Sequence, residues 1–272
     1  MNWRRVSVAA LLLGGCGAEQ AALDGLRVSP GEASEDLGKA DGDTGPRTEI
    51  KVTVDRAAIE GVLADFGLTP DVAELRDIWF YDTGDLALFE AGAILRARSV
   101  TDDDDDSTAK LRPLLASEVE PAWFQDKDFK CETDWTPSAS TSSCSLGREL
   151  DEGEVEEVAD GGDDVASLFS SEQEDFLATH GPSFDWYDLA PLGPVPAQVW
   201  KVEHDELPGK MTAELWRLPF EGFLELSVKV PDDEAEDAFA DLLDWLAVRG
   251  VPLSDTQETK TRRALEILTG QK

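Results

Sequence analysis

Basic side chains occur at alternate positions in two neighbouring segments that are typical of β-strands. Arg96 and Arg98 lie in ILRARSV, and Lys110 and Arg112 lie in TAKLRP. Because successive side chains of a strand point to opposite faces, each pair shares one face of its strand. Like charges side by side destabilise a sheet, so this arrangement needs a physical reason. Two interpretations stay open: a solvent-exposed outer face, or a concave face that binds a polyanion.

Four further segments repeat the alternation, with one apolar face and one charged face. They are TEIKVTV, QVWKVEH, AELWRL and FLELSVKV, and their charged faces carry Glu49, Lys51, Lys201, Glu203, Glu214, Glu225, Ser227 and Lys229. Acids and bases lie side by side there, whereas Thr, Gln and Ser would fill much of an ordinary solvent-facing surface. The pattern favours a charged groove or the interior of a barrel.

The segment YDTGDLALFEAGAILRAR, followed by AKLRP, resembles the core of CYTH domains, the triphosphate tunnel metalloenzyme superfamily. In that family a Tyr-(Phe)-Asp-Thr turn, a Gly-x-x-Leu-Arg-x-Arg strand and a Lys-x-Lys/Arg strand occur in this order. The segment ETKT, which contains Lys260, is similar to the family's Ser/Thr-Lys before a final helix. The resemblance covers residues 47–112 and 198–268. It implies an α+β fold, an antiparallel β-barrel or tunnel with flanking helices.

The resemblance also implies a chemistry for the charged residues. Bases would hold the phosphates of a substrate, and carboxylates would hold Mg²⁺ or Mn²⁺, which offsets charge in the transition state of phosphoryl transfer. The implied metal ligands are Glu49, Glu203, Glu214 and Glu225, and of these Glu49 and Glu225 are the catalytic candidates. The implied phosphate ligands are Lys51, Arg96, Arg98, Lys110, Arg112, Lys201, Lys229 and Lys260.

Two acidic positions of the family are replaced in this sequence. The first strand of the family carries Glu-x-Glu-x-Lys, where this chain has Arg47, Glu49 and Lys51; the late Glu-x-Glu strand becomes Glu225 and Ser227. We therefore expect a barrel that binds a phosphorylated or other anionic small molecule, or polyphosphate. A metal-dependent triphosphate or polyphosphate hydrolase stays open, and so does a structural envelope protein whose charges form internal ion pairs.

The first 16 residues, MNWRRVSVAALLLGGC, have the pattern of a secretory signal peptide, with an apolar run too short to span a bilayer. The ending LGGC resembles the lipobox of bacterial lipoproteins, which implies lipidation of Cys16; an ordinary cleaved signal is the alternative. Residues 17–46 are predicted to be a flexible acidic tether. We expect an exported lipoprotein on the periplasmic or cell-surface face, bound to the membrane only through its N-terminal lipid.

The formal net charge of −34 in 272 residues favours solubility and argues against nucleic acid as a partner. The remaining length suits one CYTH-like domain over residues 47–270, with an insertion at about 113–197. The sequence leaves the oligomeric state and the identity of the ligand open.

Cys131 and Cys144 remain if Cys16 carries a lipid. In an exported protein, two cysteines across a Ser/Thr-rich hairpin are expected to form a disulfide, and the alternative of a metal thiolate pair lacks further ligands. The run Asp102–Asp106 lacks the spacing of a calcium loop and is expected to be a solvated hairpin tip.

Overall fold

The computed structural model describes residues 25–31, 46–257 and 259–271. The predicted signal peptide with Cys16, and most of the predicted tether, lie outside the described residues. Within the tether, Arg27–Pro30 form strand β1, which pairs antiparallel with the end of β8 (Ala190–Glu203). The tether assignment is therefore corrected for this segment.

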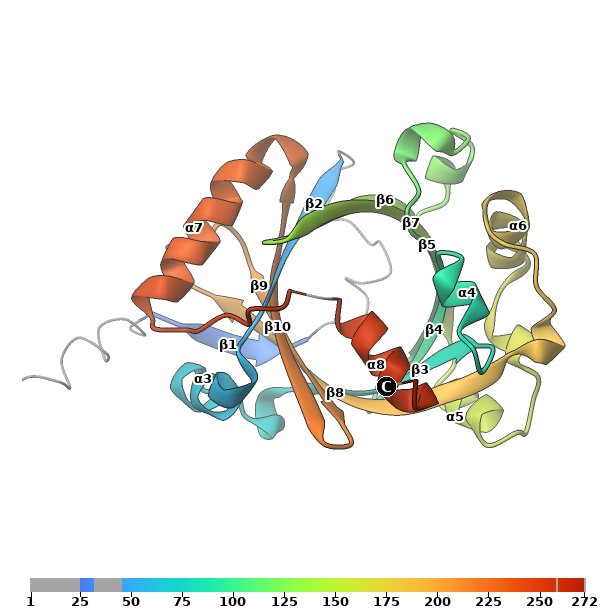
Figure 1. Cartoon of the computed structure of the whole chain (residues 1–272), viewed down its shortest axis with the longest axis horizontal. Coiled ribbons are helices and arrows are strands. Elements are labelled where there is room, and N and C mark those ends of the chain that lie inside the picture. The colour runs from blue at the N-terminus through green and yellow to red at the C-terminus, as the bar shows by residue number, and fades with distance from the viewer. Residues whose placement is uncertain (1–24, 32–45, 258, 272) are drawn as a thin grey trace, which may run out of the picture.

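In the part of the chain that the structure describes, nine strands close into a barrel, shown end-on in Figure 1. Around the ring the order is β8-β3-β4-β5-β7-β6-β2-β10-β9, and the pairing of β9 with β8 closes it. The bounds are β2 Arg47–Thr53, β3 Glu74–Asp82, β4 Ala93–Val100, β5 Asp105–Leu111, β6 Phe129–Thr136, β7 Ala139–Leu150, β9 Met211–Leu218 and β10 Glu221–Pro231.

The barrel is mixed, which corrects the prediction of an antiparallel one. β2 and β6 run parallel, with Glu49 opposite Asp134, and each other pairing among the described strands is antiparallel. Strand directions can alternate all the way around a closed ring only when the number of strands is even. With nine described strands in the ring, at least one neighbouring pair must be parallel.

Helices cover the outer face of the barrel, where most apolar side chains of the strands point, and a smaller apolar cluster around Phe80 and Trp216 packs against α8 (Lys260–Thr269). α3 (Ile59–Phe66) and α7 (Ala235–Val248) bury the apolar faces of β2, β9 and β10. α5 (Glu154–Ala159) and α6 (Ser171–His180) cover β4, β5 and β7 (Figure 1). The charged faces of the strands are thereby left for the interior, as the alternating sequence predicts.

Two further helices lie nearer the ends of the barrel. α4 (Ala87–Glu90) joins β3 to β4, and α8 (Lys260–Thr269) lies across the opening of the ring in Figure 1. Among the described residues, no helix is both long and apolar enough to cross a membrane. Short 3₁₀ turns occupy Arg56–Ala58, Pro70–Val72, Ala116–Glu118, Trp123–Gln125, Val165–Leu168, Trp186–Asp188 and Asp232–Glu234.

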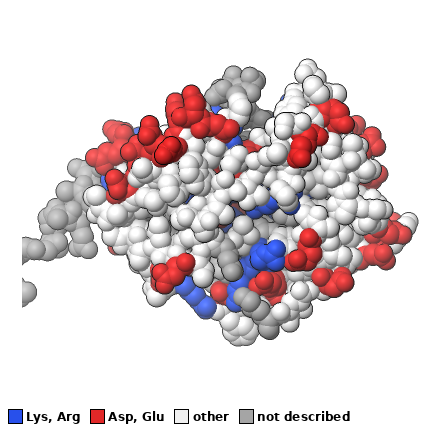
Figure 2. Space-filling view, turned by 45° about the horizontal axis from the view of Figure 1, so that its top comes forward, with Lys and Arg blue, Asp and Glu red and all other residues white. Residues whose placement is uncertain are grey.

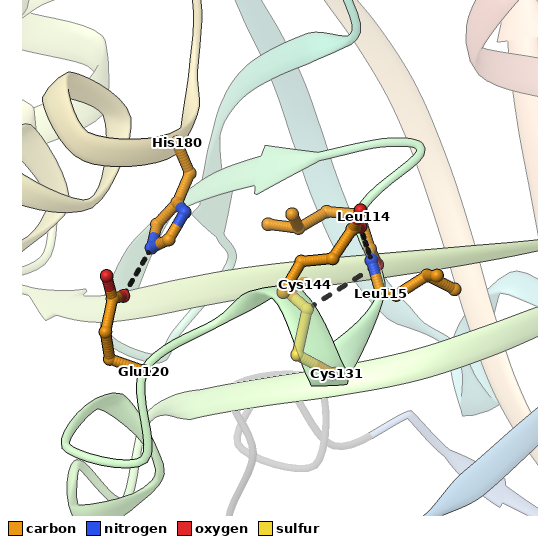
Figure 3. Close-up of a disulfide and its surroundings, with 7 residues drawn as sticks. Leu114, Leu115, Glu120, Cys131, Cys144 and His180 are labelled. Atoms are coloured by element: carbon orange, nitrogen blue, oxygen red, sulfur yellow. Dashed lines mark hydrogen bonds and ion pairs between the residues drawn. A yellow bond between two sulfur atoms is a disulfide. The ribbon is translucent and has the colours of Figure 1, made fainter.

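The predicted disulfide is confirmed. Cys131 and Cys144 lie directly opposite each other on β6 and β7, on the outer face of the barrel (Figure 3). The predicted insertion at 113–197 is therefore not wholly outside the barrel, because both of these strands belong to the ring. The disulfide fixes the hairpin whose other face points into the barrel.

The run of aspartates is not a solvated tip throughout, which corrects that prediction. Asp105 and Asp106 belong to β5, and each is 1% exposed. The Asp105 carboxylate accepts hydrogen bonds from the backbone N–H groups of Val100, Gly153 and Val155, at 3.0 to 3.2 Å. Buried carboxylates need such partners, so these two acids are structural.

The disulfide joins cysteines that are 13 residues apart in the sequence, and so restricts the unfolded chain. Replacement of Cys131 and Cys144 together by serine is therefore expected to lower the free energy of unfolding by about 3 kcal/mol. Urea denaturation followed by circular dichroism measures the change. Wild-type protein reduced with dithiothreitol is the control and should unfold at the midpoint of the double variant. Coinciding midpoints of the oxidised wild type and the double variant would contradict the expectation.

Candidate functional site

A cavity of about 150 Å³ opens inside the barrel. Its described wall includes seven basic and five acidic side chains, so these lining residues carry a formal charge of +2 (7 − 5). Figure 2 shows Lys and Arg side chains in the hollow of this face and Asp and Glu over the surrounding surface. The bases are Lys51, Arg96, Lys110, Arg112, Lys130, Lys229 and Lys260, and the acids are Glu49, Glu132, Asp134, Glu214 and Glu225.

One group of charges in the cavity centres on Asp134 of β6, whose side chain is 3% exposed. Its Oδ1 lies 2.8 Å from Nζ of Lys51 on β2, and its Oδ2 lies 3.2 Å from Nζ of Lys110 on β5. The Nη2 atom of Arg112 also donates to Oδ2. Because β2 and β6 pair in parallel, Glu49 lies beside Asp134 and binds Lys51 at 3.0 Å.

A second group centres on Lys260, the first residue of α8. Its Nζ lies 2.9 Å from Oε1 of Glu225 and also contacts Oε2 of Glu214. These two glutamates face each other in the pairing of β10 with β9. The indole of Trp216 donates to the other oxygen of Glu214 at 2.7 Å, and its ring centroid lies 4.8 Å from Nζ of Lys260. The ammonium therefore bridges two carboxylates beside an aromatic ring.

Other polar groups complete the wall. Glu132 forms ion pairs with Lys229 at 3.2 Å and with Lys130 at 3.5 Å. On β4 and β5, Arg96 donates to the hydroxyl of Thr108 at 3.4 Å. Further hydroxyl and apolar side chains come from Thr53, Thr136, Ser145, Thr259, Thr261, Phe80 and Ile94.

The neighbouring bases keep two of the cavity acids, Glu214 and Glu132, ionised. Burial raises the pKa of Glu214, but Lys260 and Arg76 lower it more, to about 2. Burial also raises the pKa of Glu132, but Lys130 and Lys229 lower it more, to about 2.

The pKa of Lys110 is lowered even though its ammonium group lies beside the Asp134 carboxylate. Burial lowers it most, and the neighbouring charges of Lys51 and Arg112 lower it further, to about 7. The charge of this side chain therefore changes within the physiological pH range, and a bound anion would stabilise its protonated form.

Within the described residues no three Asp, Glu, His or Cys side chains converge. Mg²⁺ or Mn²⁺ in this cavity would therefore have at most one or two protein carboxylates and would depend on water and phosphate oxygens for its other ligands. The facing pair, Glu214 and Glu225, is already bridged by an ammonium group. Where the family pattern has a further glutamate, this chain has Ser227 on β10.

Nine of the residues singled out from the sequence lie together on the described wall of the cavity. They are Glu49, Lys51, Arg96, Lys110, Arg112, Glu214, Glu225, Lys229 and Lys260.

The other candidates lie elsewhere. Arg98 is 1% exposed, and its Nη2 lies 2.7 Å from the Asp106 carboxylate. Lys201 is buried and donates to the Thr212 hydroxyl at 3.1 Å. Glu203 lies 3.5 Å from Arg27 of β1, at the end of β8, and is not brought together with the other glutamates.

Sequence reasoning missed the contribution of β6, which supplies Lys130, Glu132 and Asp134. The signal was present, because these charged residues alternate with Cys131, Thr133 and Trp135 as in the other strands.

Comparison with known proteins identifies the fold. No protein-family model and no curated protein matches the chain. A solved structure from Bacillus halodurans, named a "putative adenylate cyclase", matches at a TM-score of 0.56 and 15% identity, covering 80% of this chain and 97% of that one. A solved structure from Hippeastrum, named a "putative adenylyl cyclase" (HpAC1) with a dominant triphosphatase activity, matches at a TM-score of 0.56 and 17% identity, covering 79% of this chain and 93% of that one.

At these identities the likeness establishes the fold alone. It agrees with the closed barrel of nine described strands and with the order of the sequence motifs. The predicted resemblance is thereby confirmed at the level of fold: this chain folds as a CYTH-like domain.

Proposed function

We propose that the cavity binds an anionic, phosphate-rich ligand such as triphosphate or polyphosphate. The observation that carries the proposal is the charge of the cavity. The described lining residues sum to +2, whereas the whole chain carries −34. Gathering like charges in a buried space has a large electrostatic cost, which a polyanionic ligand would offset.

The geometry supports multiple contacts to phosphate oxygens. Lys51, Lys110 and Arg112 come from neighbouring parts of the wall and already point toward one acceptor, Asp134. Charge-assisted hydrogen bonds of this kind are the strong ones, and a guanidinium can bind two oxygens of a phosphate at once. The triphosphatase activity reported for the Hippeastrum protein is consistent with a phosphate chain as ligand for this fold.

Export is part of the proposal. The signal-peptide pattern and the lipobox-like Cys16 are its sequence basis. The disulfide between Cys131 and Cys144 supports it, because disulfides persist in oxidising compartments outside the cytosol. The protein would present its cavity on the periplasmic or cell-surface side of a membrane to which its lipid binds.

Metal-dependent hydrolysis of a triphosphate is the second candidate function. It is favoured by the activity reported for the Hippeastrum protein and by the presence of Glu49 and Glu225 in the cavity. The facing pair Glu214 and Glu225 is already bridged by Lys260, and Ser227 stands where the family pattern has an acid, so we place binding first. A purely structural role, in which the charges are internal ion pairs, requires no ligand.

Tripolyphosphate is expected to raise the melting temperature without added metal, because a ligand that binds the native state stabilises it by about 2.7 kcal/mol at 100 times its Kd. Arg96→Ala and Lys110→Ala should each weaken binding by roughly tenfold or more, since a hydrogen bond to a charged group contributes about 1.5–3 kcal/mol. Isothermal titration calorimetry measures these affinities.

The matched control is Lys127→Ala, which removes an exposed lysine outside the cavity. This variant should bind as the wild type does. An unchanged wild-type melting temperature at millimolar tripolyphosphate would contradict the proposed function, and so would equal losses in the control and the cavity variants.

The affinity for tripolyphosphate is expected to depend on the protonation of Lys110, whose pKa is about 7. The anion binds the protonated form better, so the contribution of this residue is complete below pH 7 and declines as the pH rises above 7. Between pH 7 and pH 8.5 the affinity should fall roughly tenfold relative to that of Lys110→Arg, which stays charged. Calorimetry of both proteins separates this effect from titration of the ligand. Parallel pH profiles would show that Lys110 does not titrate in this range.

Adding Mg²⁺ or Mn²⁺ is expected neither to produce phosphate release from tripolyphosphate nor to tighten its binding, because the cavity carboxylates are held by bases. A phosphate-release assay with and without metal measures turnover. Metal-dependent release that is lost in Glu225→Gln would overturn this ranking and establish the hydrolase.

A further inference from the structure

The position of Asp134 is unusual for an acid in a cavity that binds anions. Its carboxylate contacts Lys51, Lys110 and Arg112, whereas Glu132 on the same strand contacts Lys130 and Lys229. The Asp134 side chain is 3% exposed, and its contacts are at hydrogen-bonding distance. It therefore occupies the acceptor position that a phosphate group would need in order to reach these bases.

The backbone that carries Asp134 is held in place. β6 pairs with β2 on one side and with β7 on the other, where the disulfide joins the strands. The next residue, Trp135, points outward and stacks on Phe239 of α7, with ring centroids 5.3 Å apart and an interplanar angle of 7°. A ligand cannot displace this strand, so it must rotate the carboxylate aside or bind beside a like charge.

Both possibilities oppose binding. Rotation of the side chain breaks its hydrogen bonds to the bases, and retention of the side chain places a negative charge next to the phosphate. In the absence of ligand, the same carboxylate compensates the charge of the bases and so stabilises the empty barrel. One residue thus sets a balance between stability without ligand and affinity for ligand.

We propose that Asp134 is a resident anion that competes with the phosphate ligand for Lys51, Lys110 and Arg112 and thereby sets the affinity of the cavity. This proposal rests on the proposed function. It assigns to Asp134 the role of an affinity-determining residue, and it gives the ligand a specific location in the cavity.

The test is calorimetric titration of tripolyphosphate, without metal, into the full chain and its variants. Asp134→Asn keeps the size of the side chain and removes its charge, and it should bind roughly tenfold more tightly than the wild type. Its melting temperature without ligand should be lower, because the bases lose their counter-charge. Glu132→Gln removes a charge from the same strand and the same cavity, and its affinity should rise less than threefold.

The outcomes separate this inference from the proposed function. If the wild type binds tripolyphosphate and Asp134→Asn binds equally or more weakly, the resident-anion role is wrong while the binding function stands. An equal gain in Glu132→Gln would assign the effect to the net charge of the cavity and overturn the inference as well. Binding by neither the wild type nor Asp134→Asn would contradict the proposed function itself.

A second variant tests the role without loss of charge. Asp134→Glu retains the counter-charge that stabilises the barrel and moves the carboxylate one methylene further into the cavity. Its affinity for tripolyphosphate should fall about fivefold, because the resident anion then reaches further into the ligand's space. An affinity equal to or tighter than that of the wild type would contradict the inference, whether or not Asp134→Asn folds.

Discussion

Charge compensation inside the barrel is the constraint on which the rest of the structure depends. Most apolar side chains of the strands are buried outward against helices, so the interior receives the charged faces together with an apolar cluster that packs against α8. Charges taken out of water are costly unless partners hold them. Asp134 is held by bases from β2 and β5, and Glu214 and Glu225 are held by Lys260 of α8. The strand order therefore decides which acids and bases meet, and the pairing of β2 with β6 brings Lys51 to Asp134.

These charge contacts, and not the fold alone, determine the chemistry of the cavity. A CYTH-like barrel places bases and acids around one space, but a fold does not determine what that space does. Here the facing glutamates hold an ammonium group, and a serine, Ser227, lies where the family pattern has an acid. The described cavity combines more bases than acids with its own internal counter-charges, which supports the proposed binding of an anion. Binding of a phosphate chain follows from that arrangement more directly than metal-assisted hydrolysis does.

Alternation along the strands indicated a charged groove or barrel interior, because it determines which face a side chain takes, and the resemblance of the motifs implied the barrel fold and most of the cavity residues. Alternation does not determine which side chains of one face reach the cavity. Arg98 lies on the same face of β4 as Arg96, but it is buried against Asp106 and does not line the cavity. The odd number of strands and the role of β6 depend on pairings between distant segments. Part of the motif around Tyr81 is structural, since Asp82 accepts the N–H groups of Leu88 and Phe89 at 2.9 and 2.8 Å and so caps α4.

The most direct test of the central claim is a crystal structure of the protein with tripolyphosphate and without divalent metal. We expect phosphate groups inside the barrel, within hydrogen-bonding distance of Lys51, Lys110 and Arg112, with the Asp134 carboxylate turned away from at least one of these bases. Phosphates bound only on the outer surface would contradict it. A barrel interior without ligand at a saturating concentration would contradict it too, and would leave the charges of the cavity as internal ion pairs of a structural protein.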